Sequence, residues 1–120
     1  MVKLISLAAI SLLLFIEPRA EDPDTAILEG RVTDPRNAPI SGASVSVRNS
    51  LSGKVDVAIT DVKGWYILAG LQQGRYSAFT TAEGYGCVWI FNVPLFRGER
   101  ARLDFTLGDS HQRTSPASCK

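Results

Sequence analysis

The sequence predicts an all-β fold, a seven-stranded antiparallel β-sandwich with Greek-key connections. After Asp24, apolar and polar residues alternate with a period of two over several short segments, which is typical of strands with one buried face. Turn residues, mainly Gly, Pro, Asn and Asp, separate these segments at a spacing of roughly ten residues, as in sandwiches. No segment after Asp24 shows a sustained helical period.

The first 20 residues are expected to lie outside this fold. A short basic start precedes the apolar run of residues 4–16, which is followed by Pro18 and the small residue Ala20. This order indicates a secretory signal peptide over residues 1–20, and the run is too short to span a bilayer comfortably. We therefore expect an exported protein, periplasmic or extracellular, with no stable membrane span. An uncleaved N-terminal tether is the alternative.

Charge and length limit the remaining chain. Without Lys3, Glu17 and Arg19, the 13 basic and 12 acidic residues leave a net charge near zero. Nucleic-acid-binding proteins normally carry a basic face, so we expect no nucleic-acid partner. About 100 residues can bury one modest core. We assign residues 21–107 to a single domain and residues 108–120, which lack periodicity, to a flexible C-terminal tail.

Four alternating segments define expected strands. Each places a set of apolar or small residues on one face of its strand, with polar residues between them. In chain order, these sets are Leu28, Gly30 and Val32; Ala43, Val45 and Val47; Val55, Val57 and Ile59; and Ala101, Leu103, Phe105 and Leu107. The segments from Trp65, Tyr76 and Tyr85 onward supply the other three strands.

The segment TDVKGWY, residues 60–66, is predicted to be a hairpin turn rather than a chemical site. Asp61 at the first turn position can accept hydrogen bonds from the turn backbone, and Gly64 at the fourth adopts a positive φ at little cost. A calcium site would need more oxygen ligands than Asp56 and Asp61 supply, so we expect no metal and no other cofactor.

The two cysteines, Cys87 and Cys119, are candidates for one disulfide in an exported protein. The alternative is two unpaired thiols, with Cys87 as a small core residue. Two cysteines alone cannot supply a four-ligand zinc site.

Short motifs follow one another in a defined order from residue 27 to about residue 107. The motif residues are Gly30, Val32, Asp34, Pro39, Ile40, Gly42, Ala43, Val45, Thr60, Asp61, Gly64, Tyr66, Leu71, Gly74, Tyr76, Gly84 and Tyr85. This ordered set resembles the carboxypeptidase regulatory-like domain, a transthyretin-like or prealbumin-like sandwich with a carbohydrate-binding-like fold. The resemblance implies an accessory or binding module without catalytic activity.

Enzymes on related sandwiches are the alternative from another functional class. A small hydrolase similar to the transthyretin-related enzymes would need several histidines, and intradiol dioxygenases hold iron with two His and two Tyr. The chain has a single histidine, His111, beyond the last expected strand. We therefore expect no catalytic residues, cofactor or metal ligands.

Aromatic residues supply the candidate binding face. The resemblance places Tyr66 and Leu68 inward, which turns Trp65 and Ile67 outward. In the next strand Tyr76 and Ala78 are expected to point inward, which turns Phe79 outward. We expect Trp65, Ile67 and Phe79 to share one outer surface on adjacent strands, with Trp89 as a further candidate.

Exposed apolar patches often mark interaction surfaces. The partner expected for this face is a protein, including self-association, or a glycan stacked on the flat aromatics. Cover by another part of the chain remains the alternative to both.

Overall fold

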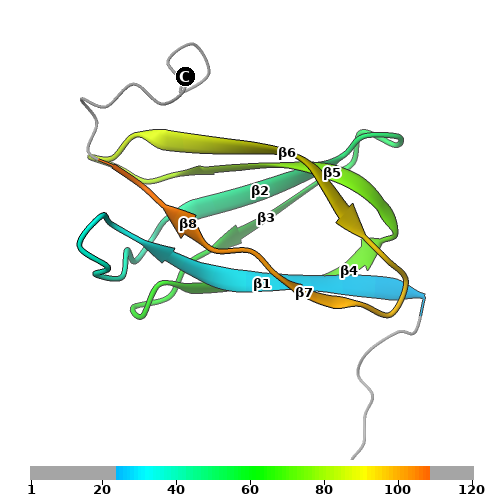
Figure 1. The fold of residues 1–120 in the computed structure, drawn as a ribbon, viewed down its shortest axis with the longest axis horizontal. Helices are drawn as coiled ribbons and strands as arrows, with labels where there is room; N and C mark the ends of the chain where they lie inside the picture. Colours follow the sequence, from blue (N-terminus) through cyan, green and yellow to red (C-terminus); the bar gives the residue numbers. More distant parts are fainter. Residues whose placement is uncertain (1–23, 109–120) are drawn as a thin grey trace, which may run out of the picture.

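A computed structural model describes residues 24–108, which form two packed β-sheets (Figure 1). The eight strands are β1 (Thr25–Thr33), β2 (Ser44–Asn49), β3 (Val55–Ile59), β4 (Trp65–Gln72), β5 (Gly74–Thr81), β6 (Cys87–Leu95), β7 (Arg100–Arg102) and β8 (Phe105–Thr106). Among these residues, no helix has the length and apolar character needed to cross a membrane. The predicted signal peptide and most of the predicted tail, including His111, lie outside the described residues.

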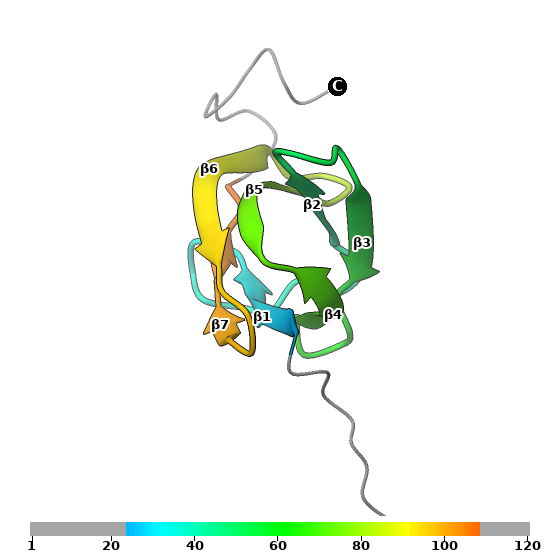
Figure 2. The ribbon, with the colours of Figure 1, turned by 90° about the vertical axis from the view of Figure 1, so that its right-hand side faces the viewer.

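The two sheets confirm the predicted all-β sandwich. One sheet has the strand order β3-β2-β5-β6, and the other has the order β4-β1-β7, with β8 pairing farther along β1. Seen from the end, β3 lies beside β4 on one side of the sandwich and β6 lies near β7 on the other (Figure 2). The expected purely antiparallel pairing needs correction, because β7 and β8 both run parallel to β1.

Eight strands replace the expected seven because the last predicted strand is interrupted at Leu103 and Asp104. At this point the chain passes directly over Gly30 of β1, where a Cβ atom would come within 1.9 Å of the Leu103 carbonyl oxygen. Only glycine permits this approach. The Arg31 amide donates to Asp104 Oδ1 at 2.9 Å, and the Tyr66 hydroxyl donates to the Leu103 carbonyl at 2.5 Å.

The core lies between the sheets and follows the predicted alternation in most strands. Its buried residues are Ala26, Leu28, Val32, Ile40, Ala43, Val45, Val47, Tyr66, Leu68, Leu71, Tyr76, Ala78, Leu95, Phe105 and Leu107. Strand β3 differs, because Val55, Val57 and Ile59 are 52%, 56% and 60% exposed. The register explains this difference. Val57 pairs with Ser46 on the outer face of the sheet, while the neighbouring Val45 and Val47 face the core.

Candidate binding site

The turn predicted at Asp61 positions the first residue of β4. Asp61 Oδ1 accepts hydrogen bonds from the amides of Lys63 and Trp65, both at 2.9 Å, and the Asp61 carbonyl accepts from Gly64 at 2.9 Å. The prediction that this turn closes a hairpin is wrong, because β3 and β4 belong to different sheets. The turn instead carries the chain across one side of the sandwich and holds the Trp65 backbone at the start of β4.

Gly64 completes this turn in a conformation that suits glycine. Its φ is +82°, and a Cβ atom there would lie 2.7 Å from the Val32 carbonyl oxygen. Its own carbonyl accepts a hydrogen bond from the Val32 amide at 2.8 Å. The turn is therefore fastened to β1, which keeps β4 and β1 in register next to Trp65.

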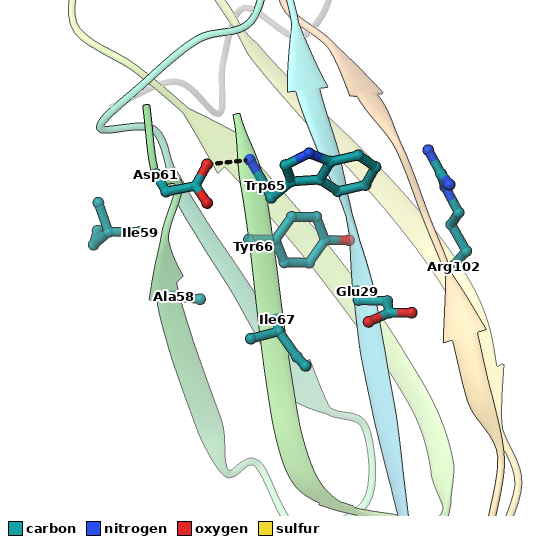
Figure 3. A pocket seen from close by; sticks show the side chains of 8 residues that line it. All are labelled: Glu29, Ala58, Ile59, Asp61, Trp65, Tyr66, Ile67 and Arg102. Atoms are coloured by element: carbon teal, nitrogen blue, oxygen red, sulfur yellow. Dashed lines mark hydrogen bonds between the residues drawn. The ribbon is translucent and has the colours of Figure 1, made fainter. Parts of the chain in front are cut away.

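Trp65 and Ile67 project from the outer face of the β4-β1-β7 sheet, where they are 39% and 52% exposed. They line a surface pocket of about 560 Å³ (Figure 3), which we call the Trp65 pocket. Its lining residues are Glu29, Ala58, Ile59, Asp61, Trp65, Tyr66, Ile67 and Arg102. They come from β1, β3, β4, β7 and the turn before β4, so the pocket spans the place where β3 of one sheet meets β4 of the other.

Two arginines lie against the Trp65 indole. The guanidinium carbons of Arg102 and Arg31 are 5.0 and 5.8 Å from the centre of its ring, within the range of cation–π attraction. The strand register brings them there, since Arg31 pairs with Trp65 and Arg102 pairs with Glu29, the cross-strand partner of Ile67. The pocket thus combines an exposed aromatic ring with cationic groups.

The carboxylates of this face are held by local partners. Glu29 receives two hydrogen bonds from Arg100, at 3.0 and 3.1 Å, and both oxygens of Asp104 accept from Arg102 Nε, at 3.1 and 3.2 Å. The hydrogen bond to Asp104 raises the pKa of Arg102, which keeps its charge fixed. Burial, assisted by the negative charge of Asp104, raises the pKa of Tyr66 well above its ordinary value of 10.0.

Phe79 and Trp89 lie on the other sheet, so the expectation that they share a surface with Trp65 and Ile67 is wrong. Strand β5 follows β4 in sequence but pairs with β2 and β6. Phe79 pairs with Trp89 at a ring-centroid distance of 4.6 Å, and Trp89 stacks on Phe91 at 5.6 Å with an interplanar angle of 3°. Alternation predicts the direction of each side chain but not the sheet to which its strand belongs.

We call the outer surface of the β3-β2-β5-β6 sheet the apolar face. It contains the half-buried Phe79 and Trp89 and four side chains that are more than half exposed. These four are Val55, Val57, Ile59 and Phe91. Cross-strand pairs connect Val57 to Ser46, Ser46 to Phe79, and Phe79 to Trp89, so the surface is continuous across all four strands.

Other predicted site residues do not form a chemical centre among residues 24–108. In this range no group of three or more His, Cys, Asp or Glu side chains is placed to hold a metal ion. Cys87 is buried at the start of β6. Its predicted partner, Cys119, lies outside the described residues, so their pairing stays a prediction.

Sequence reasoning missed Arg31, Arg102 and Glu29 as parts of the site. Each occupies a polar position of an alternating strand, the position that normally faces solvent without further role. Their meeting with Trp65 depends on the pairing of β1 with β4 and β7, which joins residues far apart in the chain. With the pairing register of β1, β4 and β7 known, these residues could have been found as those that share the outer face of the sheet with Trp65.

Solved structures share this fold. A Bacteroides uniformis protein assigned a carbohydrate-binding role is 15% identical, with a TM-score of 0.58 over 72% of this chain and 42% of its own. The Bacillus anthracis TIE protein is 22% identical, with a TM-score of 0.58 over 72% of this chain and 17% of its own. Catechol 1,2-dioxygenase from Acinetobacter radioresistens, as its L69A mutant, is 17% identical, with a TM-score of 0.61 over 81% of this chain and 55% of its own.

These likenesses establish a common architecture, and this chain spans only part of each of those proteins. No curated protein matches the sequence closely. The family model of the carboxypeptidase regulatory-like domain matches residues 27–108, which include all of β2 to β8 and β1 from its third residue onward. The chain therefore belongs to the carboxypeptidase regulatory-like domain family.

Proposed function

We propose that this protein is an exported, non-catalytic binding module whose ligand is a carbohydrate seated in the Trp65 pocket. The observation that carries the proposal is an exposed tryptophan at a pocket whose polar groups come from β1, β4, β7 and the hydrogen-bonded turn before β4. A flat aromatic ring can pack against the C–H face of a sugar, while planar charged groups hydrogen-bond to its hydroxyls. Small-ligand sites combine these elements, an apolar surface with a few oriented polar groups.

The states of the acidic groups favour binding over catalysis. A general acid or base must be free to exchange a proton with a substrate. In the pocket, Glu29 is bound by Arg100 and Asp61 is bound by turn amides. These carboxylates already serve the architecture of the site, which supports a role in recognition. Membership of a regulatory-like family and the carbohydrate-binding role assigned to one structural neighbour support the same proposal.

Export is part of the proposal and is supported by the signal-peptide pattern of residues 1–20. An exported domain would meet extracellular or periplasmic glycans, which is consistent with a sugar ligand. Sequencing the N-terminus of the protein recovered from the culture medium or the periplasm tests this part. Recovery of the full-length chain in the cytoplasm would contradict it.

A second candidate function is association with a protein, including a second copy of this chain, through the apolar face. The observation that favours it is the exposure of Phe91 at 65% and Ile59 at 60% on one continuous sheet surface. Exposed apolar surfaces of this kind often bind other proteins. The apolar face and the Trp65 pocket share Ile59 of β3, but Phe91 lies on β6 and Trp65 on β4, so variants at these two residues test the two functions separately.

The experiment for the main proposal is a glycan-array screen followed by isothermal titration calorimetry with the best oligosaccharide. Trp65→Ala is expected to weaken binding by about 30-fold or more, because it removes the central aromatic contact. Phe96→Ala serves as the matched control, since it removes another exposed aromatic, 62% exposed, in the turn between β6 and β7. Equal affinities for Trp65→Ala and the wild-type protein would contradict the proposal.

A further inference from the structure

The cationic groups beside Trp65 indicate what kind of sugar the pocket would accept, an inference that rests on the proposed function. We infer that the ligand is an acidic sugar residue of a glycan, with its ring on Trp65 and its acidic group at Arg31 and Arg102. The shared chemistry is a singly charged oxyanion on a sugar ring, either a carboxylate or a sulfate ester.

The donor geometry is the first argument. Arg102 uses Nε to bind Asp104, and Arg31 uses Nε to bind the Lys63 carbonyl at 3.1 Å. These bonds fix the orientation of both side chains. Within residues 24–108, the hydrogen bonds of both side chains are made through Nε, and their terminal Nη groups make none. A guanidinium carries five N–H donors in a rigid plane, so each retains donors suited to an oxyanion.

The charge balance around the pocket is the second argument. Glu29, Asp61 and Asp104 are each engaged by partners of this chain. Three cations, those of Arg31, Arg100 and Arg102, lie on the same face and balance these three carboxylates, so the face carries no excess negative charge. An additional oxyanion therefore meets unused donors rather than free carboxylates. Charge-assisted hydrogen bonds of this kind are stronger than those to neutral hydroxyls.

Space is the third argument. The pocket of about 560 Å³ falls in the range of small-ligand sites, roughly 300–1,000 Å³. Trp65 is 39% exposed even with two guanidinium groups beside its ring, and it lines the pocket. Ile67 and Ile59 supply apolar walls on the side away from Arg102 (Figure 3).

The test is a titration of the full protein with matched oligosaccharides. The probes are trisaccharides of galacturonate, glucuronate and mannuronate, their neutral methyl esters, and sulfated trisaccharides of the corresponding neutral sugars. We expect at least one acidic probe to bind about tenfold or more tightly than its neutral counterpart, and binding to weaken with added salt. Preference for the carboxylate or for the sulfate distinguishes the two sources of the oxyanion.

Variants locate the effect. Arg31→Gln combined with Arg102→Gln is expected to remove the preference for acidic probes while leaving weak neutral-sugar binding. Replacing both arginines by Lys should restore part of the preference for acidic probes. Arg36→Gln, at an exposed arginine in the turn after β1, is the control and should change nothing. Thermal melting of each variant shows whether it is folded.

Three outcomes would overturn the inference, and they differ in what happens to the proposed function. Equal binding of acidic and neutral probes, lost in Trp65→Ala, would overturn the acidic ligand and leave the proposed function intact. Binding of no glycan would overturn both. Binding of polyglutamate instead of the sugars would likewise overturn both and would identify an acidic peptide as the ligand.

Discussion

The two outer faces of this sandwich follow the same alternation rule and have opposite chemistry. The β4-β1-β7 face holds one exposed tryptophan among paired charges, whereas the β3-β2-β5-β6 face holds β-branched and aromatic side chains around small polar ones. A charged face with a single aromatic pocket suits a small polar ligand. A continuous apolar face suits a protein partner that covers an area of similar extent. Under the proposed functions, the two sheets would recognise different partners, a small ligand on one and a protein on the other.

The largest expected effect comes from the glycine beneath the charged face. In Gly30→Ala the new Cβ would overlap the Leu103 carbonyl, which must then move together with Asp104. We expect the free energy of unfolding to fall by more than about 3 kcal/mol, measured by urea denaturation. Gly42→Ala is the control, because a Cβ atom at Gly42 meets open space, so any loss there reflects only its positive φ of +79°, which Gly30 does not share. Equal losses in both variants would show that the close approach does not matter.

A smaller effect is expected where the turn fixes Trp65. Asp61→Ala removes the carboxylate that accepts two backbone hydrogen bonds, so stability should fall by about 1–2 kcal/mol. The affinity for the pocket ligand should fall as well. Asp34→Ala is matched to it, since Asp34 Oδ1 also accepts hydrogen bonds from two amides at 2.9 Å, in a turn that does not line the pocket. Asp34→Ala should lower stability and leave affinity unchanged; parallel losses of affinity would refute the positioning role of Asp61.

Tyr66 links the core to the charged face and makes stability depend on alkaline pH. Its folded-state pKa is raised above 10.0, so its contribution is fully present below the pKa of the unfolded chain and is lost as pH rises above it. We expect the midpoint of urea unfolding to decline above about pH 10. Tyr66→Phe should lose about 1 kcal/mol at neutral pH and show a shallower alkaline decline. An identical decline in both proteins would contradict this.

The smallest expected effect on stability comes from the apolar face. Phe91→Ser changes a side chain that is 65% exposed, so unfolding should change by less than about 0.5 kcal/mol. If the face binds a second copy, sedimentation velocity should show weaker self-association in this variant. Ile67→Ser on the opposite sheet is the control. Association that weakens only in Ile67→Ser would place the interface on the β4-β1-β7 sheet and contradict the second candidate function.

Much of the fold could be predicted from the sequence, because alternation reports which side of a strand is buried. It correctly placed Leu28 and Val45 in the core, and the family resemblance correctly placed Tyr66 and Leu68 there. The sheet to which each strand belongs could not be read this way, since the turn at Asp61 looks the same whether it closes a hairpin or crosses between sheets. The outward direction of Trp65 could be predicted from the sequence. Its contacts with Arg31 and Arg102 could not, because they depend on the register between strands far apart in the chain.

The most direct measurement crosses the two faces in one experiment. Wild type, Trp65→Ala, Phe91→Ser and the double variant would be compared by calorimetric titration with the best oligosaccharide and by sedimentation velocity. We predict that Trp65→Ala abolishes sugar binding and leaves the sedimentation profile unchanged, while Phe91→Ser leaves sugar binding unchanged. Sugar binding that survives Trp65→Ala, or that is lost equally in Phe91→Ser, would contradict the assignment of ligand recognition to the Trp65 pocket.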